Sequence, residues 1–278
     1  MKRVLTSVVA IVAGATLCAA WQPQGNSIRT QWADEVGPDN VLPEYPRPIM
    51  ERPEWKNLNG LWEYAIRRAG LATAGGYDGQ ILVPFCVESS LSGVQKPVGR
   101  GNELWYHTSF NVPRKWRGRR TLLHFGAVDW KCEVFVNDVK IGGHQGGYTA
   151  FSFDITPYLN SNGTQELTVR VWDPTDDGYG AIGKQRNRPE GIWYTSVTGI
   201  WQTVWCEPVA ERHLTKVVPT PDIDRNKLMV EAKCEGADRN DIVRVTLRDG
   251  DHVVATGRAA VGQTVELSVQ DAKLWSPD

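Results

Sequence analysis

The sequence from Gly183 to Trp205, GKQRNRPEGIWYTSVTGIWQTVW, mixes charged and amide side chains with three tryptophans and a tyrosine. A core strand would exclude the charged side chains, and a solvent-exposed loop would hold fewer indoles. The mixture therefore indicates a long functional loop, from about Trp172 to Tyr194. We expect this loop to return into a buried strand at about Ile200 to Glu207, and the rest of the chain to form the scaffold that holds it.

The sequence before this loop has the pattern of short β-strands. Alternating apolar residues and turn dipeptides predict a sandwich, and no window has an apolar period of 3.6 residues over the length of a helix. Asn137-Asp138 is expected to form the turn of a hairpin, and the glycine-rich sequence from Ile141 to Gly147 a loop. A helical turn is predicted at Asp154 to Leu159, capped by Thr156. The predicted strands are Leu61 to Ile66, Ile81 to Phe85, Leu104 to Val112, Thr121 to Phe125, Tyr148 to Ile155 and Leu167 to Trp172.

A second, smaller module follows a break near Glu211 to Leu214. About five further strands and the turn dipeptide Asp249-Gly250 indicate an immunoglobulin-like β-sandwich. Its length is short of the roughly 100 residues that such a sandwich needs, so we expect it to be incomplete at its C-terminal side. The fold class is therefore all-β, with a jelly-roll sandwich at 43–211 and the smaller sandwich at 212–278.

The N-terminal residues have the composition of an export signal. Lys2 and Arg3 precede an apolar run from Val4 to Leu17, and small residues follow, so residues 1–20 are predicted to be a signal peptide. The protein is then expected to be secreted or periplasmic. Lipoprotein anchoring through Cys18 is the alternative, although Leu17 is bulky for a lipidation motif. Residues 21–42 are polar and without pattern, which favours a flexible lead-in.

Composition excludes some classes of partner. A net charge of −1 argues against binding to nucleic acid or to an anionic membrane as the main activity. The apolar run at the N-terminus is too short for a transmembrane helix. The five cysteines are spaced unlike zinc ligands, so neither a metal nor a cofactor is expected, and a disulfide is not indicated. The chain has 12 tryptophans and three methionines. Indole faces are suited to stacking on sugar rings, but the favoured alternative is that most of these tryptophans fill the core of a β-sandwich.

Several motifs, taken in order, resemble glycoside hydrolase family 2, which includes β-galactosidases, β-glucuronidases and β-mannosidases. The resemblance covers about Val41 to Asp278, and LWSPD at the C-terminus is similar to the motif that closes the family's immunoglobulin-like domain. The motifs are RPEWKNLNGLWEY (52–64), VPFCVESSLSG (83–93), LWYHTSFNVP (104–113), VFVNDVKIGGHQGGYTAFSFDIT (134–156), and GKQ (183–185) with GIWYTSVTGIWQTVW (191–205).

The resemblance implies a sugar-binding jelly roll, then the smaller sandwich, then a catalytic (β/α)₈ barrel. Retaining glycosidases use two carboxylates, and in this family both belong to the barrel. No residue here is therefore expected to be catalytic. We expect the N-terminal, non-catalytic portion of a retaining, β-galactosidase-like enzyme, whose partners would be a β-glycoside and the missing barrel. The alternatives are a stand-alone carbohydrate-binding module and a surface adhesion sandwich without a sugar ligand.

The resemblance also implies which side chains bind the substrate. In the family, the corresponding loop reaches the mouth of the active site, so the candidates are Lys184, Gln185, Glu190 and Trp193. The alternative is that the loop supports the barrel without touching sugar. Glu88 is a further candidate, against the alternative that it caps a turn. A cation site at Asp173, Asp176 and Asp177 is the less favoured interpretation of that acidic segment, which lacks EF-hand spacing.

Overall fold

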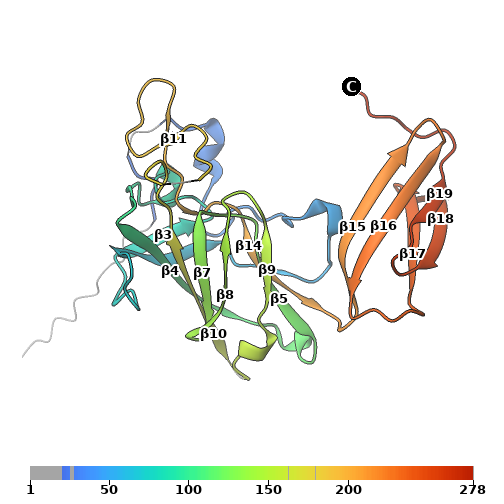
Figure 1. Ribbon diagram of the computed structural model, residues 1–278, viewed down its shortest axis with the longest axis horizontal. Coiled ribbons are helices and arrows are strands. Elements are labelled where there is room, and N and C mark those ends of the chain that lie inside the picture. The colour runs from blue at the N-terminus through green and yellow to red at the C-terminus, as the bar shows by residue number, and fades with distance from the viewer. Residues whose placement is uncertain (1–20, 26–27, 162, 179, 278) are drawn as a thin grey trace, which may run out of the picture.

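The computed structural model describes residues 21–25, 28–161, 163–178 and 180–277. These residues form two β-sandwiches that lie side by side, a larger one followed by a smaller one (Figure 1). The predicted signal peptide and Cys18 lie outside the described residues. No helix in the described part of the chain is long and apolar enough to cross a membrane. The all-β prediction is confirmed.

The larger sandwich has one sheet of six antiparallel strands in the order β3-β2-β4-β10-β7-β8. Their alternating residues place one face of each strand on the core and the other face outside. The strands are β2 (Gly60–Arg68), β3 (Gly79–Val83), β4 (Asn102–Asn111), β7 (Lys131–Val136), β8 (Val139–Gln145) and β10 (Thr164–Trp172).

The opposing sheet has four antiparallel strands in the order β1-β14-β5-β9. Its strands are β1 (Lys56–Asn57), β5 (Arg120–Phe125), β9 (Phe151–Asp154) and β14 (Val204–Val209). The core between the two sheets includes Trp62, Tyr106 and Phe125. Such a core forms the rigid scaffold on which long loops can be positioned.

Two short strand pairs belong to the loop region. β6 (Val128–Asp129) pairs with β13 (Gly199–Ile200), and β11 (Gln185–Arg186) pairs in parallel with β12 (Tyr194–Thr195). The segment around β11 and β12 extends beyond one end of the larger sandwich (Figure 1). The functional loop predicted from the sequence is therefore a projection held at its base by β6 and β13.

The smaller sandwich has a three-stranded and a two-stranded sheet. The order is β15-β16-β19 in the first, and β17 pairs with β18 in the second. Its buried core consists of Val230, Val265 and Leu267 with partly buried neighbours. The strands are β15 (His213–Asp222), β16 (Lys227–Glu235), β17 (Ile242–Asp249), β18 (His252–Ala260) and β19 (Val265–Ser268).

Short 3₁₀ helices connect the strands, and one of them corrects a prediction. The expected helical turn is present at Thr156–Tyr158, but Thr156 is not its N-cap. The carboxylate of Asp154 accepts hydrogen bonds from the backbone N–H and the hydroxyl of Thr156, at 3.0 and 2.5 Å, and so performs that role. The helices are η1 (Gln31–Glu35), η2 (Pro48–Met50), η3 (Ser90–Ser92), η4 (Arg114–Trp116) and η5 (Thr156–Tyr158).

The glycine-rich segment expected as a loop is instead largely strand β8. A Cβ on Gly142 would lie 2.4 Å from the Phe153 ring, and one on Gly143 would lie 2.7 Å from the carbonyl oxygen of Cys132. These glycines therefore permit close approach of a sheet edge to its neighbours. The hairpin turn before β8 is confirmed, because Asn137 and Asp138 have φ values of 49° and 64°.

The residues before β1 lie against the larger sandwich. The backbone N–H of Gln24 donates to the carbonyl of Ser90 at 2.9 Å, and Ala33 and Val41 are buried. Further along, Arg52 donates to the carbonyl of Leu214 at 2.5 Å, and Arg120 pairs with Glu235 at 2.5 Å. The lead-in, predicted to be mobile, thus makes specific contacts, and side chains of the first sandwich bond to the second.

Candidate functional site

The base of the projecting loop is anchored by Glu88. Its carboxylate accepts hydrogen bonds from the backbone N–H of Thr198 at 2.9 Å and from the hydroxyl of Ser196 at 3.2 Å. Glu88 follows strand β3, and Thr198 precedes β13, so the contact ties the returning end of the loop to the sandwich. The neighbouring Ser89, rather than Glu88, caps helix η3. Glu88 is buried, and its hydrogen bonds hold the returning end of the loop in place.

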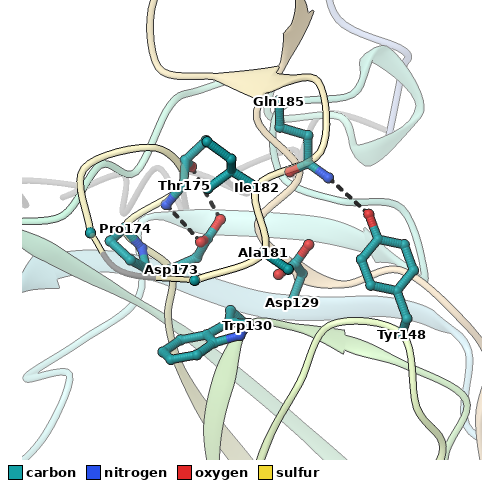
Figure 2. Close-up of a pocket in the computed structure, with 11 residues that line it drawn as sticks. Asp129, Trp130, Tyr148, Asp173, Pro174, Thr175, Ala181, Ile182 and Gln185 are labelled. Atoms are coloured by element: carbon teal, nitrogen blue, oxygen red, sulfur yellow. Dashed lines mark hydrogen bonds between the residues drawn. The ribbon is translucent and has the colours of Figure 1, made fainter.

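Two further carboxylates are buried beside the loop base. Asp173 accepts hydrogen bonds from the N–H of Thr175 at 2.8 Å and from the hydroxyl of Thr198 at 3.0 Å. Asp129 ends the short strand β6, and both side chains line a small cavity together with Gln185 and Tyr148 (Figure 2). The volume of this cavity is about 20 Å³. That is room for one water molecule and too little for a sugar ring.

Burial controls the acidity of these carboxyl groups. Desolvation raises the pKa of Glu88 to about 7, against hydrogen bonds from Thr198 and Ser196 that lower it. Desolvation also raises the pKa of Asp129 to about 7, with further contributions from the negative charges of Asp173 and Glu88. The pKa of Asp173 is raised by burial as well. The loop base is therefore a place where protons bind near neutral pH.

The tip of the loop is exposed and carries the other predicted residues. Lys184, Glu190 and Trp193 all lie on the surface, and 37% of the area of Trp193 is accessible. The guanidinium carbon of Arg186 lies 3.8 Å from the centre of the Trp193 ring, and the ammonium of Lys184 lies 5.8 Å from the centre of the Tyr194 ring. Each aromatic ring thus has a cation beside it, which is a suitable arrangement for contact with a polar ligand.

Gln185 connects the tip to the base. Its amide donates to the Tyr148 hydroxyl at 3.3 Å and accepts from the N–H of Val197 at 3.1 Å (Figure 2). The structure therefore separates the predicted residues into two groups. Lys184, Glu190 and Trp193 lie on the exposed tip, whereas Gln185 and Glu88 hold the loop in place.

Sequence reasoning missed several residues of this region. Asp129 and Tyr148 come from other parts of the chain, and Arg186 and Tyr194 were not singled out within the loop. The predicted core position of Trp205 is confirmed, while Trp201 is only half-buried and donates to the carbonyl of Gly147 at 2.7 Å. The alternation of residues in the loop gave no signal for these long-range contacts.

The acidic segment after β10 does not gather its carboxylates at one point. Asp173 points into the loop base, while Asp176 accepts hydrogen bonds from the N–H and the side-chain amide of Asn187, at 2.9 and 2.7 Å. Among the described residues, no three His, Cys, Asp or Glu side chains are grouped as metal ligands. The carboxylates of this segment instead shape the loop.

The fold is a β-sandwich with an anchored, projecting loop, and comparison with known proteins shows which family it resembles. Residues 77–205 match the family described as "Glycosyl hydrolases family 2, sugar binding domain". A β-glucuronidase of Paenibacillus borealis is 25% identical over 252 residues, which are 84% of this chain and 42% of that protein. The β-galactosidase BoGH2A of Bacteroides ovatus is 29% identical over 207 residues, which are 68% of this chain and 22% of that protein.

Solved structures show the same fold. The β-glucuronidase of Faecalibacterium prausnitzii superposes with a TM-score of 0.64 at 23% identity, covering 84% of this chain and 43% of that one. The enzyme of Bifidobacterium dentium, complexed with coumarin-3-O-glucuronide, gives a TM-score of 0.62 at 21% identity, covering 82% and 44%. The match over residues 77–205 identifies this part of the chain as a sugar binding domain of glycosyl hydrolase family 2. The chain spans less than half the length of these relatives.

Proposed function

We propose that this chain is the N-terminal, non-catalytic part of a family 2 β-glycosidase, and that its projecting loop contacts the terminal sugar of the substrate. The observation that carries the proposal is the exposed tip with Lys184, Glu190 and Trp193, standing on a base that Glu88 anchors. An indole can stack on the ring of a sugar while an ammonium and a carboxylate bind hydroxyl groups. Preorganisation by the buried base reduces the entropy cost of binding.

The charge of the tip suggests the class of sugar. Arg186 lies 3.7 Å from the carboxylate of Asp176, and of the remaining charges Lys184 and Arg188 outnumber Glu190, so a sugar carboxylate would find a favourable potential there. This favours a β-glucuronide, which also agrees with the names of several relatives. A β-galactoside is the alternative, since another relative is a β-galactosidase.

The chemistry of hydrolysis is proposed to lie outside this chain. Retaining hydrolysis needs a carboxylate nucleophile and an acid/base carboxyl facing one sugar. The buried carboxyls of Glu88 and Asp173 are instead occupied by hydrogen bonds within the loop base. The chain alone is expected to show no turnover of nitrophenyl β-glycosides above a buffer blank. Turnover that copurifies with the folded chain would contradict the proposal.

Binding at the tip can be tested by saturation-transfer NMR with methyl β-D-glucuronide and methyl β-D-galactoside. We expect transfer to the glucuronide in the wild-type chain, and its loss in Trp193→Ala. The matched control is Trp32→Ala, which removes another exposed tryptophan. Transfer that persists unchanged in Trp193→Ala would place the sugar elsewhere. A stand-alone binding module remains the second candidate function, favoured if the chain binds a sugar tightly by itself.

We also propose that the protein is exported, on the basis of the basic and apolar residues at its N-terminus. N-terminal sequencing of the mature protein checks this. A mature chain that begins near Trp21 supports cleavage of a signal peptide, and a lipidated Cys18 would show membrane anchoring instead.

A further inference from the structure

The outer face of the six-stranded sheet has a groove at the end nearest the loop. Its volume is about 300 Å³, at the lower end of the range for ligand sites. It lies over β4, β7 and β10, whose residues of one parity point away from the core. We call this the sheet-face groove. It is lined by Ala69, Glu103, Lys131, Cys132, Glu133, Arg170 and Trp172.

Arg170 at the centre of the groove is held on several sides. Its guanidinium forms an ion pair with Glu133, lies 3.9 Å from a carboxylate oxygen of Glu103 and donates to the carbonyl of Leu71 at 2.9 Å. Beneath it, the ring of the buried Trp105 lies 5.2 Å from the guanidinium carbon. A guanidinium fixed in this way can bind a ligand hydroxyl with little further loss of side-chain entropy.

An aromatic side chain forms one wall. Trp172 is half-buried, and its indole N–H donates to the carbonyl of Arg100 at 2.9 Å, which fixes the ring. Its ring centre lies 6.0 Å from that of Trp130, which lines the cavity at the loop base. Two neighbouring indoles therefore link this wall of the groove to the loop base.

The charges of the lining side chains balance. Lys131 and Arg170 are positive, and Glu103 and Glu133 are negative. A groove with this balance has no preference for an anionic ligand, but it offers donors and acceptors side by side next to an aromatic face. Sugar hydroxyls both donate and accept, and the C–H face of a pyranose is apolar. The lining therefore suits a neutral sugar better than an acidic one.

We propose that the sheet-face groove binds a neutral pyranose unit of an oligosaccharide. The ring of Trp172 packs against the apolar face of the sugar, and Arg170, Glu133 and Glu103 bind its hydroxyls. This inference does not depend on the proposed contact between the loop tip and a terminal sugar. It adds a second place on the domain where a longer glycan is held.

The test is isothermal titration calorimetry of the whole chain with neutral hexasaccharides of β-1,4-linked glucose, xylose, mannose and galactose, and with trigalacturonate. We expect at least one neutral probe to bind with a stoichiometry of one. In Trp172→Ala the affinity should fall by about tenfold or more, as for an aromatic anchor. Ala69→Gln extends a neutral side chain from an exposed position into the groove and should weaken binding without disturbing the core.

Two controls separate the possible causes. Trp32→Ala removes an exposed tryptophan that does not line the groove and should leave the affinity unchanged. Binding at the loop tip is measured separately with methyl β-D-glucuronide, so that failure of the loop proposal and failure of this one can be distinguished. Thermal melting verifies that each variant is folded. The proposal is overturned if no neutral probe binds, if trigalacturonate alone binds, or if Ala69→Gln and the folded Trp172→Ala both bind as the wild type does.

Discussion

Glu207 and Glu88 are both buried glutamates of the larger sandwich, and their surroundings are opposite in kind. The side chain of Glu207, on β14, is completely inaccessible and lies among the cations of Arg47 and Arg52, at 2.7 and 2.5 Å. Tyr45 donates to the same carboxylate at 2.6 Å, and His124 Nε2 lies 3.0 Å from it. Glu88 accepts hydrogen bonds from a backbone N–H and a hydroxyl, and it forms no ion pair with any described residue.

The two environments give opposite acidities. Desolvation works against the charged form of Glu207, but hydrogen bonds from His124 and Tyr45 and the nearby positive charges bring its pKa down to about 2. Desolvation dominates at Glu88 and raises its pKa to about 7. A carboxyl group that stays charged keeps its ion pairs across the usual pH range. A carboxyl group that titrates near neutrality forms contacts whose strength depends on pH.

The contacts of Glu207 and Glu88 hold different parts of the molecule in place. Glu207 fixes the segment that carries Tyr45, Arg47 and Arg52, and Arg52 also reaches the smaller sandwich through the carbonyl of Leu214. Glu88 fixes the base of the projecting loop. The framework is therefore held by ion pairs, whereas the contact that holds the loop changes in strength when a single proton is bound.

The largest expected effect is that of Glu207→Gln. Removing the charge leaves Arg47 and Arg52 without their common partner, so we expect the free energy of unfolding to fall by about 3–5 kcal/mol. Urea denaturation followed by tryptophan fluorescence measures it. Glu235→Gln is the matched control, since its exposed pair with Arg120 is worth under about 1 kcal/mol. If Glu207→Gln loses less than about 1 kcal/mol, charge does not hold Glu207 and its two arginines together.

The second prediction concerns the pH dependence of Glu88. Its pKa is above the ordinary value of 4.5 in the folded protein, so its contribution to stability is full below about pH 4.5 and is lost as pH rises through about 7. The loss is up to about 3 kcal/mol. Glu207 has the opposite sign, because its lowered pKa gives stability above about pH 4.5 that is lost as pH falls through about 2.

Stability measured from pH 4.5 to 8 in wild type and Glu88→Gln isolates this contribution. The lowered pKa of His124 acts in the opposite direction below about pH 6.5, but it is common to both proteins. Asp129 contributes with the same sign as Glu88 in both proteins, and contributes less in the variant, because loss of the Glu88 charge removes one cause of its raised pKa. We expect the wild type to lose more stability than the variant over this range. If stability changes equally with pH in the two proteins, titration of Glu88 does not affect the stability of the loop base.

The sequence predicts the strands and turns better than the side-chain contacts that hold them together. Strand positions follow from alternation over a few residues, and the hairpin follows from Asn137-Asp138, so local patterns suffice. The contacts of Glu88 join residues 108 and 110 positions apart, which no local pattern encodes. The sequence therefore predicted that Glu88 lies in a loop after a buried strand. It could not predict that Glu88 anchors another loop.

The missed strand β8 has a different cause. Glycine has low strand propensity, so a glycine-rich segment is interpreted as a loop when its neighbours are unknown. Gly142 belongs to a strand that pairs with β7, and this position needs a glycine because the Phe153 ring, from β9, leaves no room for a Cβ. The site residue Asp129 was missed for a related reason, since its importance arises from burial beside Asp173 rather than from any motif.

A smaller effect is expected when the acidic group at the loop base is changed. After burial itself, the negative charge of Asp173 contributes most to the raised pKa of Asp129. In Asp173→Asn the pKa of Asp129 should therefore fall, by about one unit. Carboxyl carbon NMR titration of Asp129 measures the midpoint, and Asp177→Asn, an exposed neighbour in the same segment, is the control. An unchanged midpoint would mean that the two carboxyls do not interact.

The smallest effect on stability is expected at the loop tip. Trp193 is partly exposed, and the guanidinium carbon of Arg186 lies 3.8 Å from its ring centre, so truncation removes little packing. Trp193→Ala should change the free energy of unfolding by within about 0.5 kcal/mol, whereas sugar contact at the tip should be lost. Urea denaturation and the NMR binding experiment are applied to the same sample. A destabilisation of several kcal/mol would show that Trp193 stabilises the fold. The loop tip would then not be free to serve binding alone.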